Sequence, residues 1–173
     1  MRRVFAYPLC MFFILSAALI ASGCTTNEGT EAPAERLVEH IKPEGLFNTA
    51  AYTQVVASNG GRTIYISGQV PFDKEGKLIG KDDFNAQVRQ VFENLQTALA
   101  SAGADFNNVV KVTYFIKNYK QEQLPVIREM RAKYFDKDYP PASSLIGVQS
   151  LFLDDVLIEV EAVAVMNKQH TAE

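Results

Sequence analysis

The sequence predicts a two-layer α+β domain in which a pair of helices covers one face of a mixed β-sheet. Two segments, residues 84–99 and 124–134, carry apolar side chains at three- and four-residue spacing, which is typical of amphipathic helices. Other segments alternate apolar and polar residues or are rich in β-branched ones, as strands are. We expect strands at residues 52–57, 63–69, 109–116, 144–148 and 156–166. The predicted order is therefore β-β-α-β-α-β-β.

Turn residues mark the ends of these elements. Residues 58–61 read Ser-Asn-Gly-Gly, a strong turn signal, so the strands on either side are predicted to pair as a hairpin. Gly103 stands where the first helix should end. Pro125 is tolerated only in the first turn of the second helix, and Pro140 and Pro141 follow that helix.

The last predicted strand has two apolar sides. One side carries Ile158, Val160, Ala162 and Ala164, and the other carries Leu157, Glu159, Glu161, Val163 and Val165. Neither side is cleanly polar, whereas two helices can cover only one of them. We therefore expect the uncovered face of the sheet to be buried by oligomerisation.

The N-terminus resembles a bacterial lipoprotein signal. Arg2 and Arg3 precede an almost wholly apolar stretch, residues 4–20, and Ala21-Ser22-Gly23 leads into Cys24. This pattern predicts a signal peptide at residues 1–23 and lipidation of Cys24. An uncleaved transmembrane anchor and plain secretion are the alternatives, since the apolar stretch is at the short edge of what spans a bilayer.

A polar segment separates this signal from the domain. Residues 24–40 are predicted to be a flexible tether, residues 41–167 the domain, and residues 168–173 a tail. We expect an exported, membrane-anchored protein of the cell envelope. Thr25 rather than Asp follows the cysteine, which favours the outer membrane where there is one.

Composition excludes several kinds of chemistry. Cys10 lies in the signal and Cys24 would carry lipid, so the mature domain has no thiol for catalysis, zinc or a disulfide. His40 and His170, the only histidines, lie near the ends of the chain, where surface positions are usual. We expect no metal and no cofactor. The net charge of −3 and the lack of a basic run argue against a nucleic-acid partner.

Five blocks of the chain carry a resemblance to a known family. They are residues 50–54 (AAYTQ), 67–71 (SGQVP), 87–95 (QVRQVFENL), 109–117 (VVKVTYFIK), and 141–144 (PASS) with 158–162 (IEVEA) downstream. In order and spacing they resemble the PYSQA, SGQIP, QTRQVLENL, VVKTTVFLK and PARS…VEIEA blocks of the RidA (YjgF) family of enamine/imine deaminases. The resemblance covers nearly the whole domain.

The resemblance implies a chorismate-mutase-like fold and a homotrimer with clefts between its subunits. Deaminases of this family hydrolyse 2-imino and 2-enamino acids to 2-oxo acids and ammonia. Their substrate carboxylate is held by the arginine of PARS, a position that is Ser143 here. By charge alone, Arg62, Lys111 and Lys117 are candidates to replace that arginine.

The resemblance also assigns candidate residues to the cleft. Glu159 matches the acidic residue near the attacking water, and its alternative is a solvated charge on a strand. Tyr52 matches an aromatic cleft residue, with a half-buried sheet residue as the alternative. Ser67 and Gly68 match a segment that lets substrate approach the backbone, with a bulge or a tight packing site as the alternative. Ser143 could donate one hydrogen bond to a ligand, and Leu145 could offer its backbone carbonyl.

Two functions remain open from the sequence. One is a deaminase whose substrate choice is altered by Ser143. The other is a non-catalytic trimer that binds a small ligand or a partner in the same clefts. A ribonuclease, an activity named for some family members, finds no support, because the chain has no histidine pair and no basic groove.

Overall fold

The computed structural model describes residues 36–168, and its larger sheet has four strands in the order β3-β6-β4-β5. The strands are β3 (Arg62–Gln69), β4 (Val109–Lys117), β5 (Ala142–Val148) and β6 (Ile158–Met166). β6 is antiparallel to both β3 and β4, whereas β4 and β5 are parallel. β3 and β5 are thus the two edges of the sheet. The predicted signal peptide, Cys24, His170 and the last five residues lie outside the described part of the chain.

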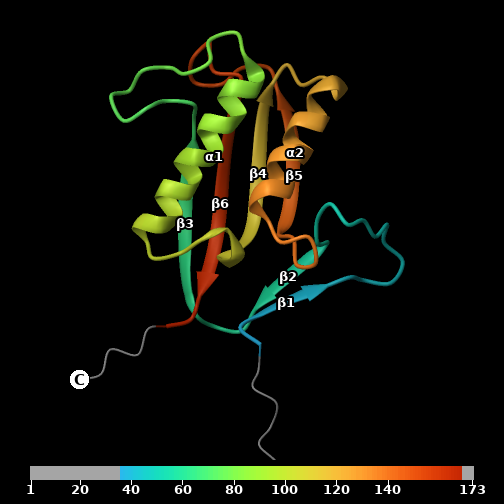
Figure 1. The fold of residues 1–173 in the computed structure, drawn as a ribbon. Helices are drawn as coiled ribbons and strands as arrows, with labels where there is room; N and C mark the ends of the chain where they lie inside the picture. The colour runs from blue at the N-terminus through green and yellow to red at the C-terminus, as the bar shows by residue number, and fades with distance from the viewer. Residues whose placement is uncertain (1–35, 169–173) are drawn as a thin grey trace, which may run out of the picture. The chain divides into compact units, whose positions relative to one another are not determined.

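Both helices lie on the same face of this sheet (Figure 1). α1 (Phe84–Ser101) is capped at its N-terminus by Asp83, whose carboxylate accepts a hydrogen bond from the Ala86 amide. It ends just before Gly103, at φ 76°, a left-handed conformation that glycine adopts readily. The short 3₁₀ helices η1 (Phe106–Asn108) and η2 (Gln121–Gln123) precede β4 and α2. α2 (Leu124–Tyr134) has proline in its first turn, as predicted.

The hydrophobic core lies between the helices and the sheet. The face of β6 that carries Ile158, Val160, Ala162 and Ala164 is buried against the helices, together with the apolar side of α1. Within residues 36–168 no helix covers the opposite face of the sheet, and Tyr65 on β3 is 81% exposed there. The predicted two-layer α+β architecture is confirmed. No helix within residues 36–168 is long and apolar enough to cross a membrane.

The predicted hairpin around residues 58–61 is wrong. β2 (Val55–Ser58) does not pair with β3, but forms a separate two-stranded sheet with β1 (Val38–Ile41). β1 was not predicted, and all of it except Ile41 occupies positions assigned to the tether. The turn sequence correctly marks the end of one strand and the start of the next. It does not determine their partners, because β3 instead pairs with β6, almost a hundred residues further along.

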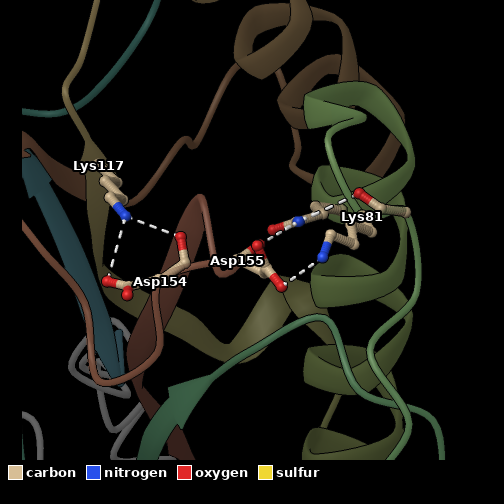
Figure 2. Close-up of polar contacts among 6 residues, drawn as sticks. Lys81, Lys117, Asp154 and Asp155 are labelled. Carbon is tan, nitrogen blue, oxygen red and sulfur yellow. Dashed lines mark hydrogen bonds and ion pairs between the residues drawn. The ribbon is translucent and has the colours of Figure 1, made fainter.

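The connection between β5 and β6 is fastened to the rest of the domain by polar contacts (Figure 2). Lys117 Nζ donates to the Asp154 carbonyl at 2.7 Å, and Lys81 forms an ion pair with Asp155 at 3.0 Å. The fully buried Gln87 amide donates to the carbonyls of Gly80 and Asp155 and accepts from the Leu157 amide. These contacts hold the start of β6, the strand that carries Glu159.

Candidate functional site

Glu159 packs directly on Gly68. A Cβ atom at position 68 would lie 1.7 Å from Glu159 Oε1, so only glycine leaves room for this carboxylate. Gly68 lies in an irregular stretch of β3, where the register with β6 shifts between Ile66 and Gln69. Glu159 is half-buried and pairs with Phe115 of β4. Because β6 buries its alternate residues under the helices, Glu159 faces the side of the sheet without helices.

A hollow of about 440 Å³ opens on the same face of the sheet. It is lined by polar side chains from three strands, among them Ser67, Lys111, Thr113 and Glu161. Lys111 Nζ donates to Ser144 Oγ at 2.6 Å. Burial lowers the pKa of Lys111, an effect that nearby Glu161 partly offsets. Ser67 is exposed here, beside Gly68.

The other predicted site residues lie at the opposite edge of the sheet. Thr53, next to half-buried Tyr52, donates from its backbone to Pro141 at 3.2 Å and from its hydroxyl to Pro140 at 2.6 Å. Tyr52 therefore lies near the start of β5. Ser143 and Leu145 are the register partners of the buried Val112 and Tyr114 of β4 and share their face of the sheet, so both point toward the helix layer.

The side chain of Leu145 packs in the domain, whereas the predicted role of this residue involves its backbone carbonyl. Its half-buried side chain packs against the hydrophobic core. The prediction concerned only its backbone carbonyl, which stays a prediction.

One chain therefore does not bring all the predicted residues together. Ser67, Gly68 and Glu159 form one group at β3 and β6, whereas Tyr52, Ser143 and Leu145 form a second group at β5. At ordinary strand spacing β3 lies about 14 Å from β5, and β6, which carries Glu159, lies about 10 Å from β5. Ser143 and Leu145 point toward the helices, whereas Ser67 and Glu159 face the other side of the sheet. Within the described residues, a single chain therefore does not unite the two groups in one site.

The three cations considered as replacements for the missing arginine have different surroundings. Arg62 donates to the Ala102 carbonyl at 2.9 Å, near the end of α1, and Lys117 is held by Asp154. Lys111 is the one of the three that lies in a hollow with a predicted site residue, Ser67.

The sequence patterns did not single out Arg131 as a site residue. It projects from α2, donates through Nη2 to the Ala51 carbonyl, and its Nε is buried with no hydrogen-bond partner among the described residues. Its guanidinium carbon lies 6.0 Å from the centre of the Tyr114 ring. Burial raises the pKa of Tyr114, whose hydroxyl also has no partner within residues 36–168. An arginine four residues after the core residue Ile127 was the signal, because that spacing places it on the inner side of the helix.

Metal-ligating residues do not gather in the described part of the chain. Within residues 36–168, no three His, Cys, Asp or Glu side chains are arranged so that they could hold a metal ion. His40 instead lies in β1 with its ring 5.5 Å from that of Tyr139.

Comparisons with known proteins place this domain in a family. The family model described as Endoribonuclease L-PSP matches residues 44–166. A RutC family protein of Pyrococcus horikoshii is 37% identical over 113 residues, which are 65% of this chain and 85% of that protein. Among solved structures, YyfB of the conserved Rid protein family from Yersinia pestis superposes with a TM-score of 0.71 at 34% identity, covering 76% of this chain and all of that one.

A RidA from an Antarctic Psychrobacter superposes less closely, with a TM-score of 0.54 at 29% identity over 69% of this chain and 97% of that one. These matches in sequence and in fold define a Rid-type α+β domain. The chain belongs to the RidA (YjgF) family, as the five sequence blocks predicted.

Proposed function

We propose that the chain is a deaminase of small imines and enamines of the 2-imino acid type, with a substrate choice altered by Ser143. The observation that carries the proposal is the contact between Glu159 and Gly68. Gly68 leaves space for the half-buried Glu159 carboxylate to lie against β3, beside Ser67. A partly desolvated carboxylate at such a place can exchange protons with an attacking water.

The reaction would add water to the carbon of the C=N bond and release ammonia. The Glu159 carboxylate takes a proton from the attacking water as the new C–O bond forms. The same proton is then delivered to the nitrogen, which gives a carbinolamine. As its C–N bond breaks, the carbinolamine hydroxyl gives up its proton, Glu159 passes that proton to the departing nitrogen, and a 2-oxo acid and ammonia remain. The step needs no oxidant and no cofactor, because only water and protons are exchanged.

The site would be shared between copies of the chain. The β3 edge of one copy carries Ser67, Gly68 and the neighbouring Glu159, whereas the β5 edge carries Tyr52 and Ser143. A ring in which the β3 edge of each copy faces the β5 edge of the next would unite the groups in every cleft. This arrangement supports the homotrimer that the family resemblance implies.

A hydrolysis assay with the full-length chain in a non-ionic detergent tests the proposal. Imines are generated in situ from several amino acids, and ammonia release is measured. We expect Glu159→Gln to lower the rate by about 100- to 10,000-fold, the usual contribution of a general acid–base group. Glu161→Gln is the matched control, since Glu161 is exposed two residues further along the same face. An equal loss in both variants, or none in Glu159→Gln, rejects this role for Glu159.

Ser143 favours a second candidate, a non-catalytic trimer that binds a small ligand or partner. A serine offers one neutral hydroxyl where an arginine offers a charged fork that pairs with both carboxylate oxygens. Replacing that arginine by serine is expected to lower the rate or affinity for a carboxylate substrate about 100-fold. If only Ser143→Arg releases ammonia, the scaffold is competent but this chain has lost the activity, and the binding function takes its place.

We also propose that the protein is a lipoprotein of the cell envelope, anchored through Cys24. The proposal rests on the sequence of residues 1–24 alone. Growth with a radiolabelled fatty acid should label the wild-type chain, whereas Cys24→Ala should remain unlabelled and keep its signal peptide. Labelling of the alanine variant contradicts this anchor.

Nucleic acid is not part of the proposed function. Single-stranded RNA incubated with the full-length chain should remain intact under the conditions of the imine assay. Cleavage that survives further purification and is lost in Glu159→Gln would replace the deaminase proposal.

A further inference from the structure

A second cavity, distinct from the hollow on the open sheet face, lies against α2. Its volume is about 470 Å³, within the range of small-molecule sites. Apolar side chains make up much of the wall, namely Ala50, Ala51, Ala132, Phe135 and Pro140. It therefore has room for a short aliphatic group next to α2.

Cations outnumber anions in the wall of this cavity. Arg128, Arg131 and Lys137 line it together with a single carboxylate, Asp136. That carboxylate accepts hydrogen bonds from the backbone amides of Asp138 and Tyr139, at 2.7 and 3.2 Å. Arg128 and Lys137 form no ion pair with any residue from 36 to 168. The local charge thus favours an anionic ligand.

Arg131 is the cation whose position is fixed. Its guanidinium is held by the Ala51 carbonyl and lies near the Tyr114 ring. A guanidinium has five N–H donors, and the Ala51 carbonyl takes one of them. The remaining donors are the kind that pair with both oxygens of a carboxylate.

The cavity adjoins the second group of predicted site residues. Ala51 precedes Tyr52, and Pro140 is bonded to Thr53 and lies three residues before Ser143. The wall of the cavity thus includes chain neighbours of Tyr52 and of β5, the strand that carries Ser143.

We propose that this cavity binds the carboxylate of small aliphatic 2-imino and 2-oxo acids, with Arg131 as the clamp that Ser143 cannot provide. The identity of the ligand rests on the proposed deaminase function. The site itself does not, because it is defined by the cavity, the fixed guanidinium and the excess of positive charge. Binding can therefore be measured without turnover.

The test is a ligand-observed NMR titration of the full-length chain in a non-ionic detergent. The probes are 2-oxobutanoate and the neutral ketone butanone. We expect saturable binding of 2-oxobutanoate, with butanone at least tenfold weaker.

Arg131→Gln should weaken 2-oxobutanoate binding at least tenfold. Arg131→Lys should reduce the affinity less, because lysine keeps the positive charge but cannot donate to both carboxylate oxygens at once. Arg89→Gln, an exposed arginine of α1, should bind like the wild type.

Two further variants separate this inference from the proposed function. Glu159→Gln should bind 2-oxobutanoate normally even when hydrolysis is lost. If ammonia release is absent in the wild type but Arg131-dependent binding persists, the deaminase proposal fails and the cavity stands. If Lys111→Gln abolishes binding while Arg131→Gln, with an unchanged circular dichroism spectrum, does not, the carboxylate binds in the hollow on the open face and this inference is wrong. Equal binding of the two probes to the wild type also overturns it.

Discussion

At the scale of single residues, the lack of a side chain at Gly68 allows the Glu159 carboxylate to lie where it does. Because a Cβ atom would lie 1.7 Å from Oε1, Gly68→Ala must displace the carboxylate. The clashing atoms are the end of a flexible side chain, so the backbone need not move. We expect Gly68→Ala to lower ammonia release at least tenfold while the urea midpoint of unfolding changes little.

The Glu159→Gln background provides the control for this prediction. If Gly68→Ala acts through the carboxylate, adding it to Glu159→Gln should cause little further loss, since residues in contact give non-additive effects. If the fold-losses in ammonia release of the two single variants multiply in the double variant, Gly68 acts through something other than Glu159.

The pKa of His40, in β1, depends on the contacts that this strand makes in the folded chain. Burial lowers its pKa below the ordinary 6.5, although Asp136 and a hydrogen bond to the Tyr139 backbone pull it upward. The folded chain then binds the proton more weakly than the unfolded one. Stability is therefore greatest above pH 6.5, falls as the pH drops through 6.5, and levels off below the folded-state pKa.

An NMR titration of the imidazole signals, assigned with His40→Gln, checks the pKa. Asp136→Asn should lower the pKa of His40 further, because it removes a negative charge and keeps the oxygen that accepts from the Asp138 amide. A pKa of His40 above 6.5, or an increase in the asparagine variant, contradicts this account.

At the scale of elements, Gln87 joins α1 to the connection before β6. Its fully buried amide satisfies three backbone groups, so Gln87→Leu leaves those groups without partners in the interior. We expect a loss of about 2–4 kcal/mol in the free energy of unfolding, at roughly 1–3 kcal/mol for each unsatisfied buried group and with partial relaxation. Urea denaturation measures it.

The same helix offers the control. Gln96 is exposed, and Gln96→Leu should change the free energy of unfolding by less than about 0.5 kcal/mol. Asp155→Asn, which removes the exposed ion pair with Lys81 but keeps the carbonyl that Gln87 binds, should also cost under about 1 kcal/mol. Similar losses in Gln87→Leu and Asp155→Asn would mean that the ion pair, rather than the amide, fastens the connection.

At the scale of the whole molecule, the open sheet face and the two separated residue groups both favour assembly. Tyr65 is 81% exposed on that face, an unusual position for a large aromatic side chain in a monomer. We expect the wild type to sediment as a trimer, and Tyr65→Glu to sediment as a folded monomer, because a buried carboxylate is costly to desolvate. Ammonia release should be lost with the trimer.

Analytical ultracentrifugation of the detergent-solubilised chain measures this, with Gln96→Glu on the helix side as the control. The control should remain trimeric and active. A monomeric wild type that still releases ammonia would mean that one chain holds a complete site, contrary to the separation of Ser143 and Glu159.

The amino-acid sequence by itself determined the elements that are periodic. The spacing of apolar residues in α1 and α2 and the alternation along β6 predicted the two-layer fold, because periodicity states which side of an element is buried. The five blocks, from Ala50–Gln54 to Ile158–Ala162, predicted the family. The missing arginine at position 143 was also visible from the sequence alone.

Tertiary structure alone decided which distant segments meet. Periodicity carries no information about partners, so the pairing of β2 with β1 and the position of Ser143 and Glu159 on different faces had to come from the fold. The contact between Gly68 and Glu159 and the cavity around Arg131 depend on residues 80 or more positions apart, as the bond from Arg131 to Ala51 illustrates. Such contacts exist only once the whole chain has packed, since each needs elements that are close in space but remote in sequence.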